Sequence, residues 1–392
     1  MRSKFFSKII LAVMMTAAVV MTAHPSDDDL APAGIIVSPS VLELHVGDKQ
    51  TLTAEVTPAD APNKNVTWGS INNYVATVNP LTGEVRAVAI GKTIITARAN
   101  GEIGFCVITV SPHVYVAGYY ANDSNVQVAT LWKNGVPQDL TDGKGHARAE
   151  SVFVYGNDVY VAGNAGGAVL WKNGVKQTLS GSSASFVFVS DGGDVYVAGQ
   201  DVDNKPVLWK NGVKQTFPPT GTDEAFANSV FVYGNDVYVA GYGHDKRTRA
   251  IPLLWKNGEL QTLDYNKDSV FAHTVFVSNN DVYVAGYDGD NAVLWKNGVQ
   301  QIQHKGSALG YSVFVSGGDV YVTGIIANDA VLWKNGVKQI LPSDGGEAFA
   351  VFVSGSDVYV TGYDDSKPVL WKNGVKQTLS TNRGIALSVF VE

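Results

Sequence analysis

Two sets of residues in the later part of the chain have types and positions that suit ligand binding. The first set consists of tyrosines that each directly follow a recurring glycine: Tyr119, Tyr242, Tyr287 and Tyr363. An exposed tyrosine ring offers a flat apolar face with a polar tip, which suits sugars and peptides. The second set takes one residue from each of seven sequence repeats: Glu150, Ser185, Asn228, His273, Tyr311, Phe349 and Leu387.

The second set predicts a binding mouth with two chemical halves. In chain order its first four members are polar and its last three are largely apolar. A ring of these residues would suit an amphipathic ligand such as a glycan or the end of a peptide. The alternative is that polar and apolar residues segregate by chance over seven positions.

Metal binding and catalysis have weaker signals. Two segments, Asp201-x-Asp203-Asn204 and Asp288-x-Asp290-Asn291, resemble the start of a calcium loop but lack its remaining ligands and its glutamate. The histidines show no metal-ligand spacing, and the chain has no GxSxG or HExxH motif. Glu150 and His273 are three repeats apart, too far for an obvious acid-base pair. We therefore expect no catalytic residues, no metal and no cofactor.

The candidate residues belong to a repeat whose core is Leu-Trp-Lys-Asn-Gly. Its tryptophan recurs at steps of 39, 38, 46, 40, 38 and 38 residues, and this near-constant period indicates a repeat architecture. Each tryptophan lies within an expected strand beside a leucine, so we expect these side chains to pack between neighbouring repeats. The seven tryptophans are Trp132, Trp171, Trp209, Trp255, Trp295, Trp333 and Trp371.

Each repeat predicts four strands, here called A to D. In the third complete copy they cover residues 229–232, 236–241, 253–256 and 260–263, and strands A and B are short runs of β-branched and aromatic residues. Such runs are typical of strands buried on both faces, and stacking seven sheets around an axis provides that burial. The sequence therefore predicts an all-β fold with a seven-bladed β-propeller over residues 113–392. An Asn-Gly dipeptide joins C to D in every copy and predicts a type I′ turn.

The two ends of the repeat region complement each other. The first copy begins at strand B with Val114 and lacks a strand A, whereas the last copy ends in a strand A at residues 388–392. We expect this C-terminal strand to pair with residues 114–118 and to close the ring, because closure removes open sheet edges.

Sequence variation is concentrated on one face of the predicted disc. In an antiparallel blade the A–B and C–D turns lie on one face, and the B–C and D–A connections lie on the other. The first pair is short and nearly uniform, whereas the second pair differs from copy to copy and is expected to begin with the four tyrosines. This pattern favours a binding face. The alternative is that these loops vary because nothing constrains them.

The N-terminus has the layout of an export signal. Basic residues up to Lys8 precede an apolar run from Ile9 to Ala23, which is too short for a comfortable membrane span. We expect a signal peptide over residues 1–23, a linker over residues 24–33, and no membrane span after cleavage. The alternative is a retained anchor helix.

The segment after the apolar run is acidic. Residues Ser26–Asp29 resemble the tail that follows the lipidated cysteine in surface lipoproteins of Bacteroidota. The only cysteine in the chain is Cys106, so a lipid anchor is not supported and no intramolecular disulfide can form. We expect an exported protein that is periplasmic, on the cell surface or extracellular.

Residues 34–110 have the pattern of a separate module. Short apolar alternations with turn signals about every 8 to 12 residues predict a small β-sandwich. Its landmarks occur in the order Val46-Gly47-Asp48, Val56-Thr57-Pro58, Val66-Thr67-Trp68, Val75-Ala76-Thr77-Val78, Gly83-Glu84-Val85 and Ala87-Val88-Ala89-Ile90-Gly91. This order closely resembles the group 2 bacterial immunoglobulin-like domain. The resemblance implies an extracellular seven-strand sandwich that commonly acts as a stalk or spacer, with Trp68 and Cys106 in the core.

Composition limits the class of partner. The formal net charge is -7 and the chain has no basic run, which makes it a poor candidate for binding a phosphate backbone. We therefore expect no nucleic-acid partner, and we expect a monomer.

These features predict a secreted or cell-surface binding or adhesion protein, and not an enzyme. Its loop face would recognise a glycan or a protein ligand. Two alternatives stay open: a polysaccharide-active enzyme, such as a lyase or glycosidase, on the same face, and a structural component of the envelope. Fold alone does not choose among them.

Overall fold

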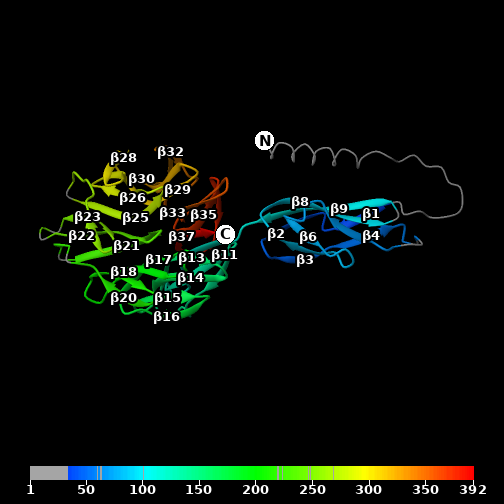
Figure 1. The fold of residues 1–392 in the computed structure, drawn as a ribbon, viewed down its shortest axis with the longest axis horizontal. Helices are drawn as coiled ribbons and strands as arrows, with labels where there is room; N and C mark the ends of the chain where they lie inside the picture. Colours follow the sequence, from blue (N-terminus) through cyan, green and yellow to red (C-terminus); the bar gives the residue numbers. More distant parts are fainter. Residues whose placement is uncertain are drawn as a thin grey trace. The chain divides into compact units, whose positions relative to one another are not determined.

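The computed structural model describes residues 34–392 except 60, 62, 63, 100, 219, 223, 246, 248 and 268. All the regular elements of this described part are β-strands, β1 to β37 (Figure 1). The chain divides into two compact units between Ser111 and Pro112. The predicted signal peptide and linker, residues 1–33, lie outside the described residues.

The N-terminal unit is a β-sandwich. Its sheets have the strand orders β2-β9-β8-β5, β3-β7-β6 and β1-β4. Leu52 separates β3 from β4 and the segment at Pro39 separates β1 from β2, so these nine strands correspond to the seven that were expected. The strands are β1 (Gly34–Ser38), β2 (Val41–His45), β3 (Lys49–Thr51), β4 (Thr53–Thr57), β5 (Thr67–Ser70), β6 (Ala76–Val78), β7 (Glu84–Ala87), β8 (Gly91–Ala99) and β9 (Glu102–Ser111).

Trp68 and Cys106 lie in the core of this sandwich, as predicted. Both are buried in one apolar cluster with Leu52, Val85 and Ile95. Burial raises the pKa of the Cys106 thiol to about 11, so this cysteine is an inert packing group at neutral pH. The side chains between the sheets hold the unit together, as expected for a chain without a disulfide.

The C-terminal unit is a seven-bladed propeller, and each blade is a four-stranded antiparallel sheet. The innermost strands of blades 1 to 7 are β13 (Arg148–Tyr155), β17 (Ser183–Val189), β21 (Glu224–Tyr233), β25 (Val270–Ser278), β29 (Ala308–Ser316), β33 (Gly346–Ser354) and β37 (Gly384–Val391). The second strands are β14 (Asp158–Asn164), β18 (Val195–Gln200), β22 (Asp236–His244), β26 (Asp281–Asp288), β30 (Asp319–Ile326), β34 (Asp357–Asp364) and β10 (Val114–Ala121).

The outer half of each blade carries the tryptophan repeat. The third strands are β15 (Ala168–Lys172), β19 (Pro206–Lys210), β23 (Ala250–Lys256), β27 (Asn291–Lys296), β31 (Asp329–Lys334), β35 (Lys367–Lys372) and β11 (Gln127–Lys133). The outermost strands are β16 (Val175–Thr178), β20 (Val213–Thr216), β24 (Glu259–Gln261), β28 (Val299–His304), β32 (Val337–Ile340), β36 (Val375–Thr378) and β12 (Val136–Asp139).

The C-terminal strand closes the ring, as predicted. β37 pairs antiparallel with β10, from Val114 opposite Val391 to Tyr120 opposite Gly384. The backbones of His113 and Glu392 exchange two hydrogen bonds of 2.8 and 3.1 Å, which extend this pairing to the last residue of the sequence. Blade 7 therefore combines strands from both ends of the repeat region.

The seven tryptophans pack between blades, as predicted. All are at most 1% exposed, because each indole lies among side chains of its own blade and its neighbour. Trp171 of blade 1, for example, clusters with Tyr115 and Leu131 of blade 7. This packing holds adjacent sheets together and leaves the indoles unavailable to a ligand.

Seven phenylalanines form a closed belt inside the ring, one from each innermost strand. Neighbouring ring centroids are 4.7–5.1 Å apart all the way round, including the step from blade 7 to blade 1. An apolar cavity of about 110 Å³ lies against these rings. We call them the Phe belt: Phe153, Phe188, Phe231, Phe276, Phe314, Phe352 and Phe390.

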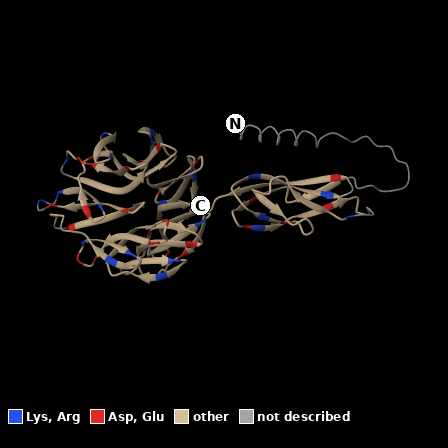
Figure 2. Ribbon diagram, viewed as in Figure 1, with Lys and Arg blue, Asp and Glu red and all other residues tan. Residues whose placement is uncertain are grey.

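The C–D turns hold each blade in register. Their asparagines have φ of 50–53° and the following glycines have φ of 76–84°, as the Asn-Gly dipeptide predicts. In blade 5 the Asn335 side chain accepts the Val320 amide at 2.8 Å and donates to Asp319 at 2.8 Å, and Asp319 also pairs with Lys334. Acidic and basic residues are interspersed over the propeller (Figure 2).

Candidate functional site at the mouth of the propeller

All seven residues of the second predicted set occupy the same structural position, a β-bulge in the innermost strand. In every blade the pairing of the first two strands shifts register at this point, so one residue of the innermost strand has no direct partner. A bulge re-aims the side chains around it. All seven residues are partly exposed: Glu150, Ser185, Asn228, His273, Tyr311, Phe349 and Leu387.

The recurring glycine of the second strand makes the bulge possible. In blade 4, a Cβ placed on Gly286 would lie 1.9 Å from the Phe271 carbonyl oxygen, and the equivalent distances in the other blades are 1.8–2.1 Å. A side chain at this position would force the two strands apart. The glycine that precedes each candidate tyrosine is therefore part of the device that shapes the mouth.

The strands continue beyond the bulge, which corrects the predicted boundaries. Strand A of blade 3 was expected over residues 229–232, but β21 begins at Glu224. The four candidate tyrosines were expected to begin loops, but they lie within β10, β22, β26 and β34. The reason is that pairing resumes after the bulge, so each tyrosine faces a partner on the innermost strand.

A flanking pair therefore lies beside each bulge on what we call the mouth face, the side of the B–C and D–A connections. Each pair joins the residue two positions before the bulge residue to the residue after the strand-B glycine. In blades 1 to 7 the flanking pairs are Arg148 with Asn164, Ser183 with Gln200, Phe226 with Tyr242, Phe271 with Tyr287, Leu309 with Ile325, Glu347 with Tyr363 and Ile385 with Tyr119.

The flanking pairs change the predicted division of the mouth. A polar half was expected over four blades, from Glu150 to His273. In the structure only blades 1 and 2 combine polar bulge residues with polar flanking pairs. Asn228 and His273 lie in blades whose flanking pairs are aromatic. In both blades the innermost strand supplies a phenylalanine to the pair and the second strand supplies a tyrosine.

Two of the candidate tyrosines stack on other aromatic rings. Tyr242 lies 4.5 Å from Phe226 at an interplanar angle of 11°, and 4.6 Å from Phe271. Phe271 in turn lies 4.6 Å from Tyr287. These four residues form an aromatic wall across blades 3 and 4. Because the rings cover one another, Tyr242 and Tyr287 are half-buried and offer a ligand less open ring face than predicted.

Tyr119 corrects the prediction of an exposed rim. It is 8% exposed, because the guanidinium of Arg148 lies 4.8 Å above its ring. The Arg148 Nε also donates to Gln127 Oε1 at 2.8 Å, which keeps the cation in place. Tyr119 is therefore largely covered by a neighbouring blade.

The mouth face is hollowed where blades 6 and 7 meet. A cavity of about 590 Å³ opens there, and we call it the mouth pocket. Three of the predicted site residues line it, Tyr119, Phe349 and Tyr363, together with Glu347 and Arg383. The pocket combines aromatic surface with one acidic and one basic group, a composition common in binding sites for small polar ligands.

Glu347 is held by two tyrosine hydroxyls. Tyr311 donates to one carboxylate oxygen and Tyr363 to the other, both at 2.9 Å. Burial, with the nearby Glu347 as a further cause, raises the pKa of Tyr363 to about 12 and also raises the pKa of Tyr311. Both hydroxyls are therefore protonated donors at neutral pH, and they fix the Glu347 carboxylate at the wall of the pocket.

Two further bulge residues have perturbed pKa values. Burial lowers the pKa of His273 to about 4, and its Nε2 is buried without a hydrogen-bond partner. Its ring lies between Tyr287 at 5.4 Å and Tyr311 at 5.5 Å. Burial raises the pKa of Glu150, an effect that Arg148 partly offsets. His273 is thus neutral near pH 7 with an unused polar atom at the mouth.

The two calcium-like segments organise turns. Asp201 accepts the amides of Asp203 and Lys205 at 2.9 Å and pairs with Lys214 at 2.9 Å. Asp288 accepts hydrogen bonds from Asn266 and Gln300. Across the described residues, no group of three or more His, Cys, Asp or Glu side chains is placed to hold a metal ion.

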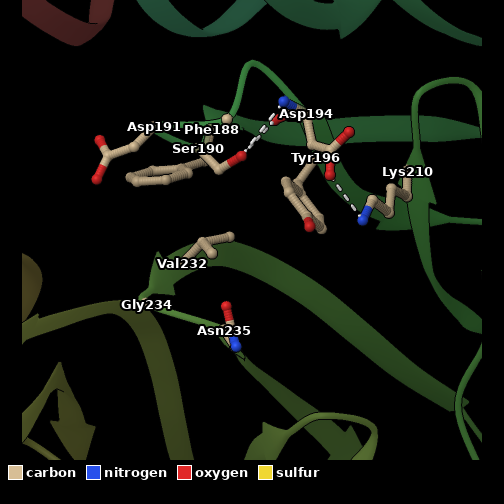
Figure 3. Close-up of a pocket in the computed structure, with 10 residues that line it drawn as sticks. Phe188, Ser190, Asp191, Asp194, Tyr196, Lys210, Val232, Gly234 and Asn235 are labelled. Carbon is tan, nitrogen blue, oxygen red and sulfur yellow. Dashed lines mark hydrogen bonds and ion pairs between the residues drawn. The ribbon is translucent and has the colours of Figure 1, made fainter.

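A second cavity, of about 400 Å³, lies on the opposite side, which we call the turn face (Figure 3). It lies between blades 2 and 3, beside the A–B turn that runs from Ser190 to Asp194. This turn is one residue longer than its counterparts, and Asp194 pairs with Lys210 at 2.7 Å as the equivalent residues do in other blades. The cavity therefore follows from a local insertion into the repeated scaffold.

Glu347, Arg383, Phe226 and Phe271 were missed as mouth residues. A usable signal was present, because aligned repeats vary strongly two positions before the bulge residue. Arg383 lies just before β37, in the connection between blades 6 and 7. Its equivalent in the next blade is His146, which also lines the mouth pocket.

Comparison with known proteins supports the interpretation of the first unit. Residues 32–102 match the bacterial Ig-like domain (group 2) family. An Ig-like virion protein of Serratia phage KSP90 is 44% identical over 84 residues, which are 21% of this chain and 33% of that protein. A lacto-N-biosidase of Bifidobacterium bifidum is 37% identical over 99 residues, 25% of this chain and 9% of that protein. The chain thus spans a third or less of the length of these relatives.

Among solved structures, the WD40 β-propeller domain of Doa1 has a TM-score of 0.45 and 17% identity, covering 64% of this chain and 86% of that one.

The described residues contain no helix with the length and hydrophobicity needed to cross a membrane. The Ig-like domain and the propeller place the chain in the general class of extracellular or binding proteins.

Proposed function

We propose that this protein is a secreted or cell-surface carbohydrate-binding protein that holds a glycan in the mouth pocket between blades 6 and 7. The observation that carries the proposal is the composition of this pocket. Tyr363 and Phe349 supply aromatic surface, and Glu347 is fixed beside them by two tyrosine hydroxyls. A sugar ring has an apolar face that packs on aromatic rings and hydroxyls that donate to a carboxylate.

The size and place of the pocket agree with this role. Its volume of about 590 Å³ lies in the range of small-molecule sites. It also lies on the face where the loops differ from blade to blade, over a scaffold that is otherwise uniform.

The test is a glycan array probed with the wild-type protein and two tyrosine variants. Tyr363→Ala removes ring surface from the mouth pocket and should weaken binding about tenfold or more. Tyr233→Ala removes a partly exposed tyrosine from the turn face and should leave binding unchanged. A wild-type protein that binds no glycan, or equal binding by both variants, would refute the proposal.

A second candidate function, glycan cleavage, rests on Glu150. Its raised pKa is the kind of perturbation found in general acids of glycosidases. Such an enzyme also needs a second carboxylate beside the first, whereas Glu150 does not line the mouth pocket, where Glu347 is the only acidic lining residue that the structure describes. Release of reducing ends from a bound glycan, abolished by Glu150→Gln, would establish this function. We favour binding without cleavage.

A further inference from the structure

Arg383 is the unpaired cation of the mouth pocket. Its side chain is exposed, and no hydrogen bond or ion pair of its guanidinium occurs among the described residues. The other propeller arginines differ. Arg148 is bound to Gln127 and covers Tyr119, Arg249 pairs with Asp245 at 2.8 Å, and Arg247 also has a partner. Arg383 therefore has donors to offer a ligand.

The backbone around Arg383 is fixed at the edge of the pocket. Its carbonyl accepts the Ala121 amide at 2.7 Å, and the next amide, of Gly384, donates to the Ser366 carbonyl at 2.8 Å. Gly384 approaches β10 so closely that a Cβ on Gly384 would lie 2.2 Å from the Tyr119 carbonyl oxygen. The base of the Arg383 side chain is therefore held in place, which reduces the entropy lost when a ligand binds.

The acidic group of the pocket does not neutralise this cation. Both oxygens of Glu347 accept hydrogen bonds from Tyr311 and Tyr363, and no ion pair with Arg383 is formed. An uncharged ligand would use Tyr363 and Glu347 and would leave the exposed donors of Arg383 to water. A ligand with an anionic group would satisfy them, since the planar guanidinium matches carboxylate and sulfate oxygens with paired hydrogen bonds.

We propose that the sugar unit held in the mouth pocket carries an anionic substituent, a carboxylate or a sulfate, and that Arg383 receives it. This inference rests on the proposed glycan-binding function and specifies its ligand. The ring of the sugar packs on Tyr363 and Phe349, its hydroxyls reach Glu347, and its anionic group points to Arg383. Selectivity for acidic over neutral sugars then comes from one residue.

The test measures the affinity of the full chain for charged and uncharged versions of the same sugars by calorimetry. The probes are galacturonic acid oligosaccharides, their methyl esters, and sulfated galactose oligosaccharides with desulfated counterparts. We expect one charged series to bind at least about tenfold more tightly than its uncharged partner. Arg383→Gln should remove this difference in affinity. Arg98→Gln, which changes an exposed arginine of the Ig-like unit, should retain the difference. Added salt should reduce the affinity of the wild-type protein for the charged sugars.

The outcomes separate this inference from the function on which it rests. Preference for the carboxylated or the sulfated series, lost in Arg383→Gln, supports the proposal and identifies the anionic group. Equal affinity for charged and neutral sugars, unchanged in Arg383→Gln, overturns the proposal but leaves glycan binding intact. Failure to bind any glycan overturns both. Binding of a short peptide, titrated in the same way, with no binding of any sugar also overturns the proposal.

Discussion

His273 illustrates how single residues at the mouth depend on their surroundings. It lies between Tyr287 and Tyr311, and burial lowers its pKa to about 4. Its side chain is therefore neutral at physiological pH, although a solvated histidine is partly charged there. The folded protein binds a proton at this site less readily than the unfolded chain does, which links His273 to stability.

We predict that acid weakens the fold through His273. The pKa of His273 is lower in the folded state than in the unfolded state, where it is about 6.5. The contribution of neutral His273 to the free energy of unfolding is therefore complete above pH 6.5. It is lost as the pH falls from 6.5 towards 4. His273→Phe should reduce this part of the pH dependence, measured as the free energy of unfolding in urea at pH 7 and pH 5. His304→Gln should keep this pH dependence. If His273→Phe showed the same difference in the free energy of unfolding between pH 7 and pH 5 as the wild type, that result would count against this account.

The alignment of the repeats identified equivalent candidate positions but did not show what each side chain does there. Tyr242, Tyr287 and Tyr363 have the same sequence context after a glycine. Tyr242 and Tyr287 stack on phenylalanines of the facing strand, whereas Tyr363 faces Glu347 and donates to it. The difference depends on a cross-strand partner that is distant in sequence, so it emerges only when the strands are paired.

At the scale of the strand, the bulge is the device that gives the mouth its shape. Each innermost strand carries one extra residue opposite the recurring glycine of the second strand. The Asn-Gly turns and strand order were predictable because they follow from local backbone preferences. The bulge was not, because it depends on the register between two strands. The invariant glycine was its visible trace in the repeats.

We predict that the strand-B glycine tolerates no side chain. Gly286→Ala would place a methyl group 1.9 Å from the Phe271 oxygen and should lower the free energy of unfolding by about 2 kcal/mol or more. Gly145→Ala is the matched control, since a Cβ at this position would have no atom within 4 Å. This substitution should change the free energy of unfolding by less than about 0.5 kcal/mol. Denaturant titration compares the two, and equal midpoints would disprove the steric role of Gly286.

At the scale of the whole propeller, closure decides the architecture. Blade 7 takes β37 from the C-terminus and β10 to β12 from the start of the repeats. This exchange was predictable because one end lacked a strand that the other end supplied. The mouth pocket was not predictable in the same way, since it lies between blades 6 and 7 and needs side chains from both.

Removal of the last seven residues, 386–392, should therefore open the ring. It deletes Val389 and Val391, which are buried. It also deletes Phe390, the member of the Phe belt that contacts Phe352 of blade 6 and Phe153 of blade 1. Each such side chain contributes roughly 1.5 to 3 kcal/mol through burial. The exposed edge of β10 should promote aggregation. A truncated protein that elutes as a monodisperse monomer with an unchanged melting temperature would show that β37 is dispensable.

The central claim is that one pocket on the mouth face holds the ligand. The most direct measurement is a crystal structure of the full chain with the glycan that binds most tightly on the array. The account predicts a sugar ring against Tyr363 and Phe349, with hydroxyls near Glu347. Ligand density on the turn face, or on the Ig-like unit with the mouth pocket empty, would contradict it.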